Sequence, residues 1–327
     1  MHLLFSSEYG GAEKTAIEII KKKKETNKFI YVSRKGNINK QLDEQNITYY
    51  LLDNINFFSL KKIITENNVQ IIHAHDFRAS ILASFFSKYC KIISHIHQAP
   101  IWLEKKNIKS LVYNYRTRKF QKIYVVSKNI IETYPYPTKK RFELLENQVD
   151  TPSVVCSNKI YDFMFLGRLE IAKDPISFLE FIKSYQKESS QKIKSIIIGA
   201  GSLEKELKEY AYVNDLDVEF IGFSDFPYSY IVQAKYMMVT SQKEGFGIGI
   251  IESMQLGVPI ITKKIGGVTD ELTSQNAIIY QDTGELIRRL KNIDSEKYNQ
   301  LSKNAKQFGN KFRSKSKDEI EDIYYND

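Results

Sequence analysis

Residues 244–271 read EGFGIGIIESMQLGVPIITKKIGGVTDE, and this stretch decides the fold. The glycines at its start leave the backbone uncovered by side chains, so the backbone N–H groups there can approach a ligand closely. Good helix formers follow up to Leu256, and Gly257-Val258-Pro259 is a typical helix stop. Because the N-terminus of a helix carries unpaired N–H groups and partial positive charge, a phosphate or diphosphate is the expected ligand. The residues that offer these N–H groups are Gly245, Phe246, Gly247 and Ile248.

Two carboxylates accompany this helix start. Glu244 stands just before the loop and Glu252 lies one turn inside the helix, so both can line the same pocket. Carboxylates accept hydrogen bonds from sugar hydroxyls, which suits a ligand that carries both phosphate and sugar. Beyond the helix, residues 258–262 are predicted to form a short buried strand that ends at the glycine turn Gly266-Gly267. The spacing of the two glutamates is weak evidence alone. It becomes specific together with the glycine loop, the helix, the helix stop, the strand and the second glycine turn.

Short apolar runs alternate with longer amphipathic runs along the rest of the chain. This alternation predicts an α/β protein with doubly wound parallel sheets, helices on both faces and ligands at the carboxyl ends of the strands. In the first half the predicted strands are 2–6, 29–33, 47–52, 71–74, 92–96 and 122–126, with helices at 13–23 and 80–89. In the second half they are 161–166, 193–198, 218–221 and 236–240, with helical residues at 284–308.

Groups suited to a nucleotide diphosphate follow three strands of the second half. Arg168 and Lys173 leave the strand at 161–166, where Arg168 offers a planar fork of donors and Lys173 a mobile point charge. Gly199 ends the next strand in a turn of the type that borders a nucleotide, and Phe223 follows the strand at 218–221. These residues are candidate ligand contacts.

Taken together, these motifs resemble the signature of the retaining GT-B glycosyltransferases, in particular family 4, the glycosyl transferases group 1. The resemblance runs from Gly10 to about Glu271. Near the start, Tyr9-Gly10-Gly11-Ala12-Glu13 resembles the Gly-Gly-Ala-Glu turn that lies against the sugar nucleotide in that family. The resemblance implies two Rossmann-like domains that face each other across a cleft, with the nucleotide sugar held mainly by the second.

The resemblance also implies an activity. This activity is the transfer of a sugar from a nucleotide-diphosphate sugar to an acceptor hydroxyl with retention of configuration. Among such donors, a UDP-sugar is expected. The setting would be bacterial surface polysaccharide or glycoconjugate synthesis, with a saccharide, lipid-linked or protein acceptor. Fixed positive charge at the diphosphate takes the place of a metal, so no metal or other cofactor is expected.

The resemblance assigns roles to individual residues. His97 corresponds to a histidine that touches the transferred sugar, and Glu252 would bind the ribose. The residues expected to be catalytic are Arg168, Lys173, Glu244 and His97. The residues expected to bind the nucleotide sugar are Gly10, Gly11, Gly199, Phe223, Gly245, Phe246, Gly247, Ile248 and Glu252.

The expected domains are residues 1–150, on the acceptor side, and residues 151–327, which bind the nucleotide sugar. Residues 146–158 contain Pro, Ser and Asn without periodicity and are the expected linker. Asn147-Gln148-Val149-Asp150 departs from the Asn-Gly-Val-Asp usual in the family, which affects the expected turn and not the boundary. A last helix at about 314–325 would cross back to the first domain in the family.

The composition is that of an ordinary globular protein. Its 327 residues suffice for two domains, and 42% hydrophobic and 27% charged residues fit this class. No apolar run reaches the ~20 residues of a membrane span, and no signal-peptide pattern precedes the first strand. The two cysteines fit no metal spacing. We therefore expect a reduced, cytoplasmic protein.

Positive charge is concentrated in the first half. Residues 1–150 carry 25 Lys and Arg against 14 Asp and Glu, a net +11, whereas residues 151–327 have a net charge of −2. The first half is therefore expected to face something anionic. Residues 102–122 read as a basic amphipathic helix, either packed on the sheet or lying on a membrane surface. Among anionic partners, we expect a peripheral contact with anionic membrane on its inner face and no nucleic acid.

Two alternatives to active glycosyl transfer remain. His73 and His75, and His95 and His97, form two His-x-His pairs near strand ends. Residues two apart on a strand point to the same side, so each pair could clamp a metal in a metal-dependent hydrolase, with Asp76 nearby. No further carboxylate or cysteine cluster completes an obvious ligand set. The other alternative is a catalytically inactive GT-B partner subunit, against which the intact charged motifs argue.

Overall fold

The computed structural model describes residues 1–6, 9–23, 28–98, 100–154, 158–189 and 192–314. Two compact units make up this part of the chain: unit 1 comprises the described residues up to 147, and unit 2 comprises those of 148–314. The helix expected at 314–325 lies, after its first residue, outside the described residues.

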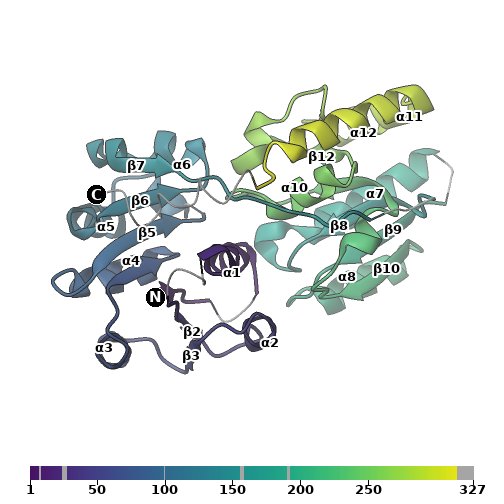
Figure 1. The fold of residues 1–327 in the computed structure, drawn as a ribbon. Helices are drawn as coiled ribbons and strands as arrows, with labels where there is room; N and C mark the ends of the chain where they lie inside the picture. Colours follow the sequence, from purple (N-terminus) through teal and green to yellow (C-terminus); the bar gives the residue numbers. More distant parts are fainter. Residues whose placement is uncertain (7–8, 24–27, 99, 155–157, 190–191, 315–327) are drawn as a thin grey trace. The chain divides into compact units, whose positions relative to one another are not determined.

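Unit 1 contains a parallel sheet, which is seven-stranded within the described residues (Figure 1). From one edge to the other its strands are β3 (Tyr49–Leu52), β2 (Tyr31–Arg34), β1 (His2–Leu3), β4 (Ile71–Ala74), β5 (Lys91–Ile96), β6 (Lys122–Val125) and β7 (Phe142–Leu144). The helices are α1 (Gly11–Lys23), α2 (Asn39–Glu44), α3 (Phe57–Glu66), α4 (Phe77–Ala83), α5 (Ile108–Arg116) and α6 (Lys128–Thr133). The order reverses direction between β1 and β4, as in a doubly wound fold.

Unit 2 repeats this plan with six parallel strands among the described residues. In spatial order they are β10 (Asp217–Gly222), β9 (Lys194–Ile198), β8 (Tyr161–Leu166), β11 (Ala234–Val239), β12 (Ile260–Thr262) and β13 (Ala277–Ile279). Its helices are α7 (Pro175–Ser189), α8 (Glu204–Val213), α9 (Tyr228–Ile231), α10 (Ile248–Gln255), α11 (Thr283–Lys291) and α12 (Ser295–Asn310). Here the order reverses between β8 and β11.

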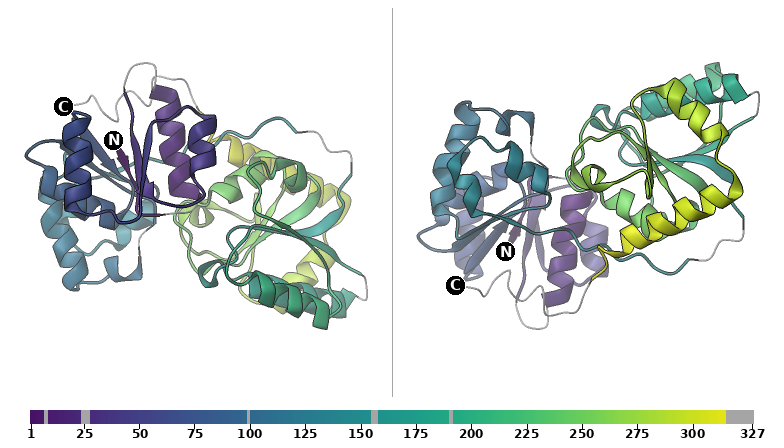
Figure 2. Two further views of the ribbon diagram at one scale, coloured as in Figure 1. Left: turned by 90° about the horizontal axis from the view of Figure 1, so that it is seen from below. Right: turned by 90° about the horizontal axis from the view of Figure 1, so that it is seen from above.

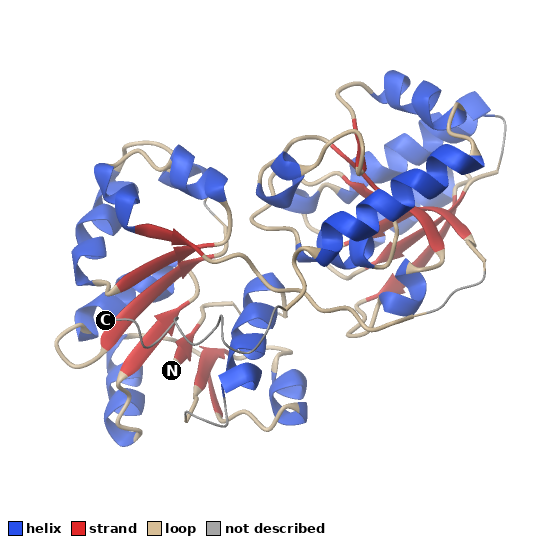
Figure 3. Cartoon of the chain, turned by 45° about the horizontal axis from the view of Figure 1, so that its top comes forward, coloured by secondary structure: helices blue, strands red, loops and turns tan. Residues whose placement is uncertain are grey.

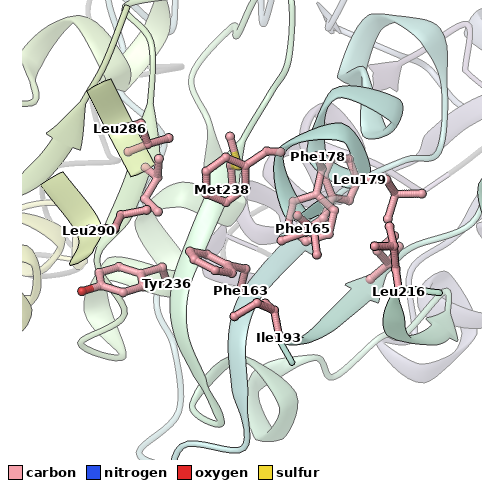
Figure 4. Close-up of a cluster of buried hydrophobic side chains, with 14 of the residues drawn as sticks. Phe163, Phe165, Phe178, Leu179, Ile193, Leu216, Tyr236, Met238, Leu286 and Leu290 are labelled. Carbon is pink, nitrogen blue, oxygen red and sulfur yellow. The ribbon is translucent and has the colours of Figure 1, made fainter. Parts of the chain in front are cut away.

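In each unit the strands form one layer with helices on both of its faces (Figures 2 and 3). A strand covered on both faces must be apolar at odd and even positions alike. β8 meets this condition, because Phe163 and Phe165 are buried on one face and Met164 on the other. Figure 4 shows Phe163 and Phe165 within the larger core of unit 2, which α7, α8 and α11 close.

The parallel α/β architecture expected from the alternation is confirmed in both units. β4 and β8 have the predicted bounds, and the other predicted strands differ at their ends by one to three residues. β7 and β13 were not predicted. Each has only three residues and lies at a sheet edge, so neither leaves a clear alternation in the sequence.

The continuous helix expected at 102–122 is wrong in its extent. The helical residues there are α5, preceded by a 3₁₀ turn at Ile101–Leu103 and followed by another at Thr117–Lys119. Asn107 starts α5 with a capping box, in which its side chain accepts a hydrogen bond from Ser110 N (3.0 Å) and its own N–H donates to Ser110 Oγ (2.9 Å). Part of the amphipathic segment is helical, but the cap at Asn107 prevents one continuous helix over the whole of it.

Candidate active site

The carboxyl ends of β8 and β11 lie side by side at the reversal point of the sheet in unit 2. Ligands of doubly wound sheets bind at this place, because loops from neighbouring strands diverge there. The loop after β8 carries Arg168 and Lys173, and the loop after β11 carries Glu244 and the glycines before α10. Two segments that the sequence singled out separately are thus neighbours in the fold.

Backbone contacts fix the loops after β8 and β9 relative to each other. Gly199 has a φ of +146°, and a β-carbon there would lie 1.9 Å from the carbonyl oxygen of Gly167. No side chain can be accommodated at that distance, so glycine is required at position 199. Gly199 therefore serves the close approach of two loops at this edge.

Lys173 and Glu244 form an ion pair. Lys173 Nζ donates to Glu244 Oε1 at 2.6 Å, and Ser241 Oγ donates to the same oxygen at 2.7 Å. The Glu244 side chain is 9% exposed and that of Lys173 is 26% exposed, so the ammonium lies between the buried carboxylate and solvent. Within the described residues, the second oxygen of Glu244 makes no hydrogen bond. The pair compensates the buried charge and leaves Oε2 for another hydroxyl.

Arg168 stands on the same loop with its side chain exposed. The loop is anchored next to it by Glu170, which accepts hydrogen bonds from Ser202 N at 2.8 Å and from Ser202 Oγ at 2.7 Å. These two bonds, with a smaller contribution from the Arg168 guanidinium, lower the pKa of the Glu170 carboxyl. Arg168 thus extends into solvent from a loop that is held in place.

The glycine loop before α10 rests on the second glycine turn of the motif. Gly247 caps α10 in the left-handed region, with a φ of 96°. A β-carbon at Gly267 would lie 2.7 Å from the carbonyl oxygen of Gly245, and Val268 N donates to Phe246 O at 2.9 Å. Phe246 is buried, with its ring 5.5 Å from that of Phe312. Only the backbone of Phe246 is therefore suited to ligand contact, which narrows its expected role.

Glu252 lies on α10 and is also buried. Tyr228 of α9 donates a hydrogen bond from its hydroxyl to Glu252 Oε1 at 3.0 Å. Phe223 follows β10 and is 53% exposed, beyond Gly222 with a φ of +76°. The structure therefore places every predicted ligand residue of unit 2 on α10 or on a loop at the carboxyl edge of its sheet.

Three polar contacts of this edge were not anticipated from the sequence: those of Ser241, Tyr228 and the Glu170–Ser202 pair. The only sequence signal for Ser241 is a hydroxyl three residues before Glu244 in the same loop. Tyr228 and Ser202 carry no such signal, because each comes from a segment distant in sequence from its partner.

The predicted residues of unit 1 lie at the carboxyl edge of its own sheet. Gly10 and Gly11 follow β1, and Gly11 is the first residue of α1. His97 follows β5 and is drawn into a cluster of all five histidines of the chain. His75 connects this cluster, with Nε2 2.8 Å from His2 Nδ1 and Nδ1 2.9 Å from His97 Nε2. Burial lowers the pKa of His97 to about 3, so its imidazole is neutral at neutral pH.

Two groups of these histidines have donor atoms close enough to share a metal ion: His2, His73 and His75, and His75, His95 and His97. Neutral imidazoles suit zinc, copper or nickel. However, His75 belongs to both groups and already uses both of its nitrogens in contacts with other imidazoles. Asp76 serves another purpose, since its carboxylate caps α4 by accepting from Ala79 N at 2.7 Å. The same carboxylate accepts from Phe5 N, which follows β1, at 2.9 Å. The arrangement thus gives little support to the hydrolase alternative.

The chain is similar in sequence to known glycosyltransferases. Residues 154–308 match the family model described as Glycosyl transferases group 1. An uncharacterized glycosyltransferase of Methanocaldococcus jannaschii is 26% identical over 266 residues, which cover 77% of this chain and 74% of that protein. The capsular polysaccharide biosynthesis glycosyltransferase CapH of Staphylococcus aureus is 20% identical over 287 residues, 81% of each chain.

Among solved structures, Anabaena HepE in complex with UDP and glucose matches with a TM-score of 0.79 at 18% identity, covering 96% of this chain and 95% of that one. The two parallel-sheet units are those of the GT-B fold. The part of the chain that matches the glycosyl transferases group 1 is residues 154–308, which fall within the bounds of unit 2.

Proposed function

We propose that the protein transfers a sugar from a UDP-sugar to an acceptor hydroxyl with retention of configuration, in the synthesis of a bacterial surface polysaccharide or glycoconjugate. The observation that carries the proposal is the carboxyl edge of unit 2, where the Lys173–Glu244 pair adjoins the glycine loop that starts α10. The relative CapH, named for capsular polysaccharide biosynthesis, supports the setting. The HepE complex with UDP and glucose supports the choice of donor.

The chemistry required is cleavage of the bond between the sugar C1 and the diphosphate oxygen. Cleavage leaves an oxocarbenium-like centre and releases a nucleoside diphosphate whose terminal phosphate has gained a second negative charge. Positive groups that face the leaving group stabilise this transition state, and this term is usually the largest. In our proposal Arg168, Lys173 and the N–H groups of residues 245–248 supply that charge, so that no metal ion is needed.

The buried glutamates hold the rest of the donor. Glu252, oriented by Tyr228, would accept from the ribose hydroxyls. Glu244 would accept a hydroxyl of the transferred sugar at Oε2, since Lys173 and Ser241 already occupy Oε1. The exposed ring of Phe223 offers a face on which the base can stack.

Groups of unit 1 complete the proposed set. The backbone at Gly10 and Gly11 would lie against the nucleotide sugar, and neutral His97 would contact the transferred sugar. Retention would result from attack by the acceptor hydroxyl on the same face from which the diphosphate departs. A covalent intermediate on Glu244 is not part of this proposal, because hydrogen bonds from Lys173 and Ser241 reduce the nucleophilicity of its carboxylate.

One face of α5 is apolar and exposed, and a membrane-bound acceptor would explain this exposure. This helix is buried through Ser110 and Tyr113, and Tyr113 OH lies 2.8 Å from Ser94 Oγ of β5. The opposite face is apolar yet exposed, with Ile108 82% and Tyr115 62% accessible to solvent. The residues that form it are Ile108, Leu111, Val112 and Tyr115, and we call them the α5 face.

Aromatic and basic residues extend the α5 face. Arg116 lies over the ring of exposed Phe85 at 4.1 Å, and Phe85 neighbours Phe57 at 6.5 Å between ring centroids. Exposed cations stand close to it in the sequence: Lys105, Lys106, Lys109, Arg118 and Lys119. Exposed apolar side chains together with exposed cations fit the interface of an anionic membrane. The contact that we propose is peripheral. Among the described residues, no helix is long and apolar enough to span a bilayer.

Release of nucleotide from a panel of donors tests the proposed function. The full-length protein is incubated with UDP-, GDP- and ADP-sugars without any acceptor, and the free nucleoside diphosphate is measured. We expect slow release from one or more UDP-sugars and background release from the other donors. Background release from every donor, or preference for another base, would contradict the proposal.

A further inference from the structure

The five histidines of unit 1 are arranged in two rows across three neighbouring strands. His2 belongs to β1, His73 and His75 come from β4 and the residue after it, and His95 and His97 come from β5 and the residue after it. β1 and β4 pair in parallel with His2 opposite His73, and β5 lies on the other side of β4. Side chains two residues apart share a face, so the register brings all five rings together.

The first row is a hydrogen-bonded ribbon formed by His2, His75 and His97, with nitrogen–nitrogen distances of 2.8 and 2.9 Å. The corresponding ring centroids are 5.0 and 5.2 Å apart, and the planes are inclined by only 20° and 19°. Each centroid separation exceeds the nitrogen separation by about the width of one imidazole ring. The bonded nitrogens therefore lie close to the lines that join the centroids, and the three rings are nearly coplanar.

The second row consists of His73 and His95, which stack on the ribbon. Their centroids lie 4.2 Å from His75 and 4.1 Å from His97, respectively. His95 is completely buried, and neither of its nitrogens has a partner among the described residues. This row thus packs against the ribbon, and His95 takes no part in the hydrogen bonds of the ribbon.

The ribbon couples the tautomers of its three members. A neutral imidazole has one N–H donor and one bare nitrogen acceptor. If His75 donates from Nδ1 to His97, it must accept at Nε2 from His2, and all three rings carry their proton on Nδ1. If the direction is reversed, all three carry it on Nε2. The first state makes His97 Nδ1 a donor, whereas the second makes it an acceptor.

We infer that His2 and His75 are positioning residues that hold His97 in the Nε2–H tautomer, so that its Nδ1 accepts a hydrogen bond from a hydroxyl of the transferred sugar. His97 Nδ1 is buried and has no partner among the described residues. A buried donor without an acceptor is rarer in folded proteins than an acceptor without a donor, which favours the state with a bare Nδ1. Burial, which keeps the rings neutral, is consistent with this arrangement. The inference rests on the proposed role of His97 in sugar binding.

Long-range proton–nitrogen NMR of the full-length protein labelled with ¹⁵N-histidine tests the ribbon without any substrate. We expect His2, His75 and His97 each to show a single neutral Nε2–H tautomer at pH 7. Rapid averaging between tautomers in the unmodified protein, Nδ1–H forms, or a protonated ribbon would overturn the inference. This measurement needs no variant and so does not depend on one that folds.

Matched variants then separate the ribbon from simple packing. His75→Phe should allow the tautomers of His97 to average and reduce kcat/KM for transfer about tenfold or more. His75→Gln, whose amide can accept from one neighbour and donate to the other, should restore the tautomer of His97 and most of the lost activity. His95→Phe keeps an aromatic ring in the second row and should leave the tautomers of the ribbon unchanged.

Two outcomes distinguish the possible failures. If His97 keeps its single tautomer in His75→Phe and transfer is unaffected, the ribbon does not position His97 and the inference is wrong. If the tautomers respond as expected but His97→Phe transfers sugar at the normal rate, the ribbon is correct and the proposed role of His97 in sugar binding fails.

Discussion

Lys173 and Glu244 form the contact on which the proposed donor site depends. Their ion pair, with Ser241 on the same carboxylate oxygen, gives each residue a double role. The ammonium compensates a carboxylate that is 9% exposed and still has two N–H groups left for a diphosphate. The carboxylate fixes the position of an otherwise flexible lysine. Individual residues at this edge therefore support both the fold and the proposed reaction.

Loss of either leaving-group cation should slow transfer severely. We expect Arg168→Ala and Lys173→Ala each to reduce kcat by about 10²-fold or more, because removing a preorganised charge from a transition state costs ~3–4 kcal/mol. Steady-state kinetics with the best donor of the panel checks this. Near-normal kinetics in both variants would eliminate the proposed diphosphate site.

Because Lys173 also forms an ion pair with Glu244, the melting temperature of each variant provides a control for the kinetic experiment. Lys173→Ala should also lower the melting temperature, since it leaves Glu244 buried without its partner, whereas exposed Arg168→Ala should not. The double variant Lys173→Ala/Glu244→Gln should regain stability but not turnover. If the double variant regained turnover, the reduced activity of Lys173→Ala would result from impaired folding and not from a lost contact with the diphosphate.

The two buried glutamates should differ in their effects on ligand binding. Glu252→Gln should weaken binding of free UDP about tenfold, because it removes the carboxylate proposed for the ribose. Glu244→Gln should leave UDP affinity within about twofold, because its proposed partner is the sugar that free UDP lacks. Isothermal titration calorimetry decides between them, and equal losses would refute the division of roles.

The buried histidines should make unit 1 sensitive to acid. Burial lowers the pKa of His97 to about 3, against 6.5 for an ordinary histidine, and lowers that of the other four as well. The unfolded chain then binds more protons than the folded one below pH 6.5, so the free energy of unfolding falls as the pH falls from 7 to 5. The expected slope is up to about 1.4 kcal/mol per pH unit for each histidine that stays neutral.

Urea titrations followed by tryptophan fluorescence measure this slope. Trp102 is the one tryptophan of the chain and belongs to unit 1, so its signal reports that unit. His95→Phe removes one of the neutral histidines and should make the slope shallower. A free energy of unfolding that is constant between pH 7 and pH 5 would contradict the neutral cluster.

At the scale of single elements, the sequence identified α10 well and α5 poorly. α10 was expected up to residue 256 and ends at 255, because Gly247 and Gly257 limit it by backbone conformation alone. In α5 the apolar pattern predicted which residues share a face but not whether that face is buried. Tyr113, an aromatic on the opposite side, holds the helix to the sheet through the hydroxyl of Ser94. Only tertiary structure could show that the apolar face is the exposed one.

Binding to anionic vesicles tests the proposed role of the α5 face. The protein should bind vesicles that contain an anionic phospholipid and release them as salt rises, since exposed charges are screened over ~8 Å at physiological ionic strength. Reversing Lys105, Lys106 and Lys109 to Glu should weaken binding strongly and leave UDP affinity unchanged. The triple reversal of Lys205, Lys303 and Lys306, which are exposed in unit 2, is the control of equal charge change. Equal effects of both reversals would show only a dependence on net charge.

For the whole molecule, alternation and glycine placement were sufficient to predict two doubly wound parallel sheets. They also predicted which loops carry the candidate residues, because in such sheets the carboxyl ends of the strands define the edge. The side-chain contacts could not be predicted from the sequence, since Lys173 and Glu244 are 71 residues apart, and His2 and His75 are 73 apart. Sequence patterns report local order, whereas these pairs depend on strand order and register.

Calorimetric titration of UDP in the presence of EDTA tests most directly the central claim, that unit 2 binds a nucleoside diphosphate through its own cations and helix N-terminus. We predict that the unmodified protein binds UDP with the same affinity before and after EDTA treatment, and that Lys173→Ala binds it at least tenfold more weakly. Failure of UDP to bind, or binding that EDTA abolishes and a divalent metal restores, would contradict the account.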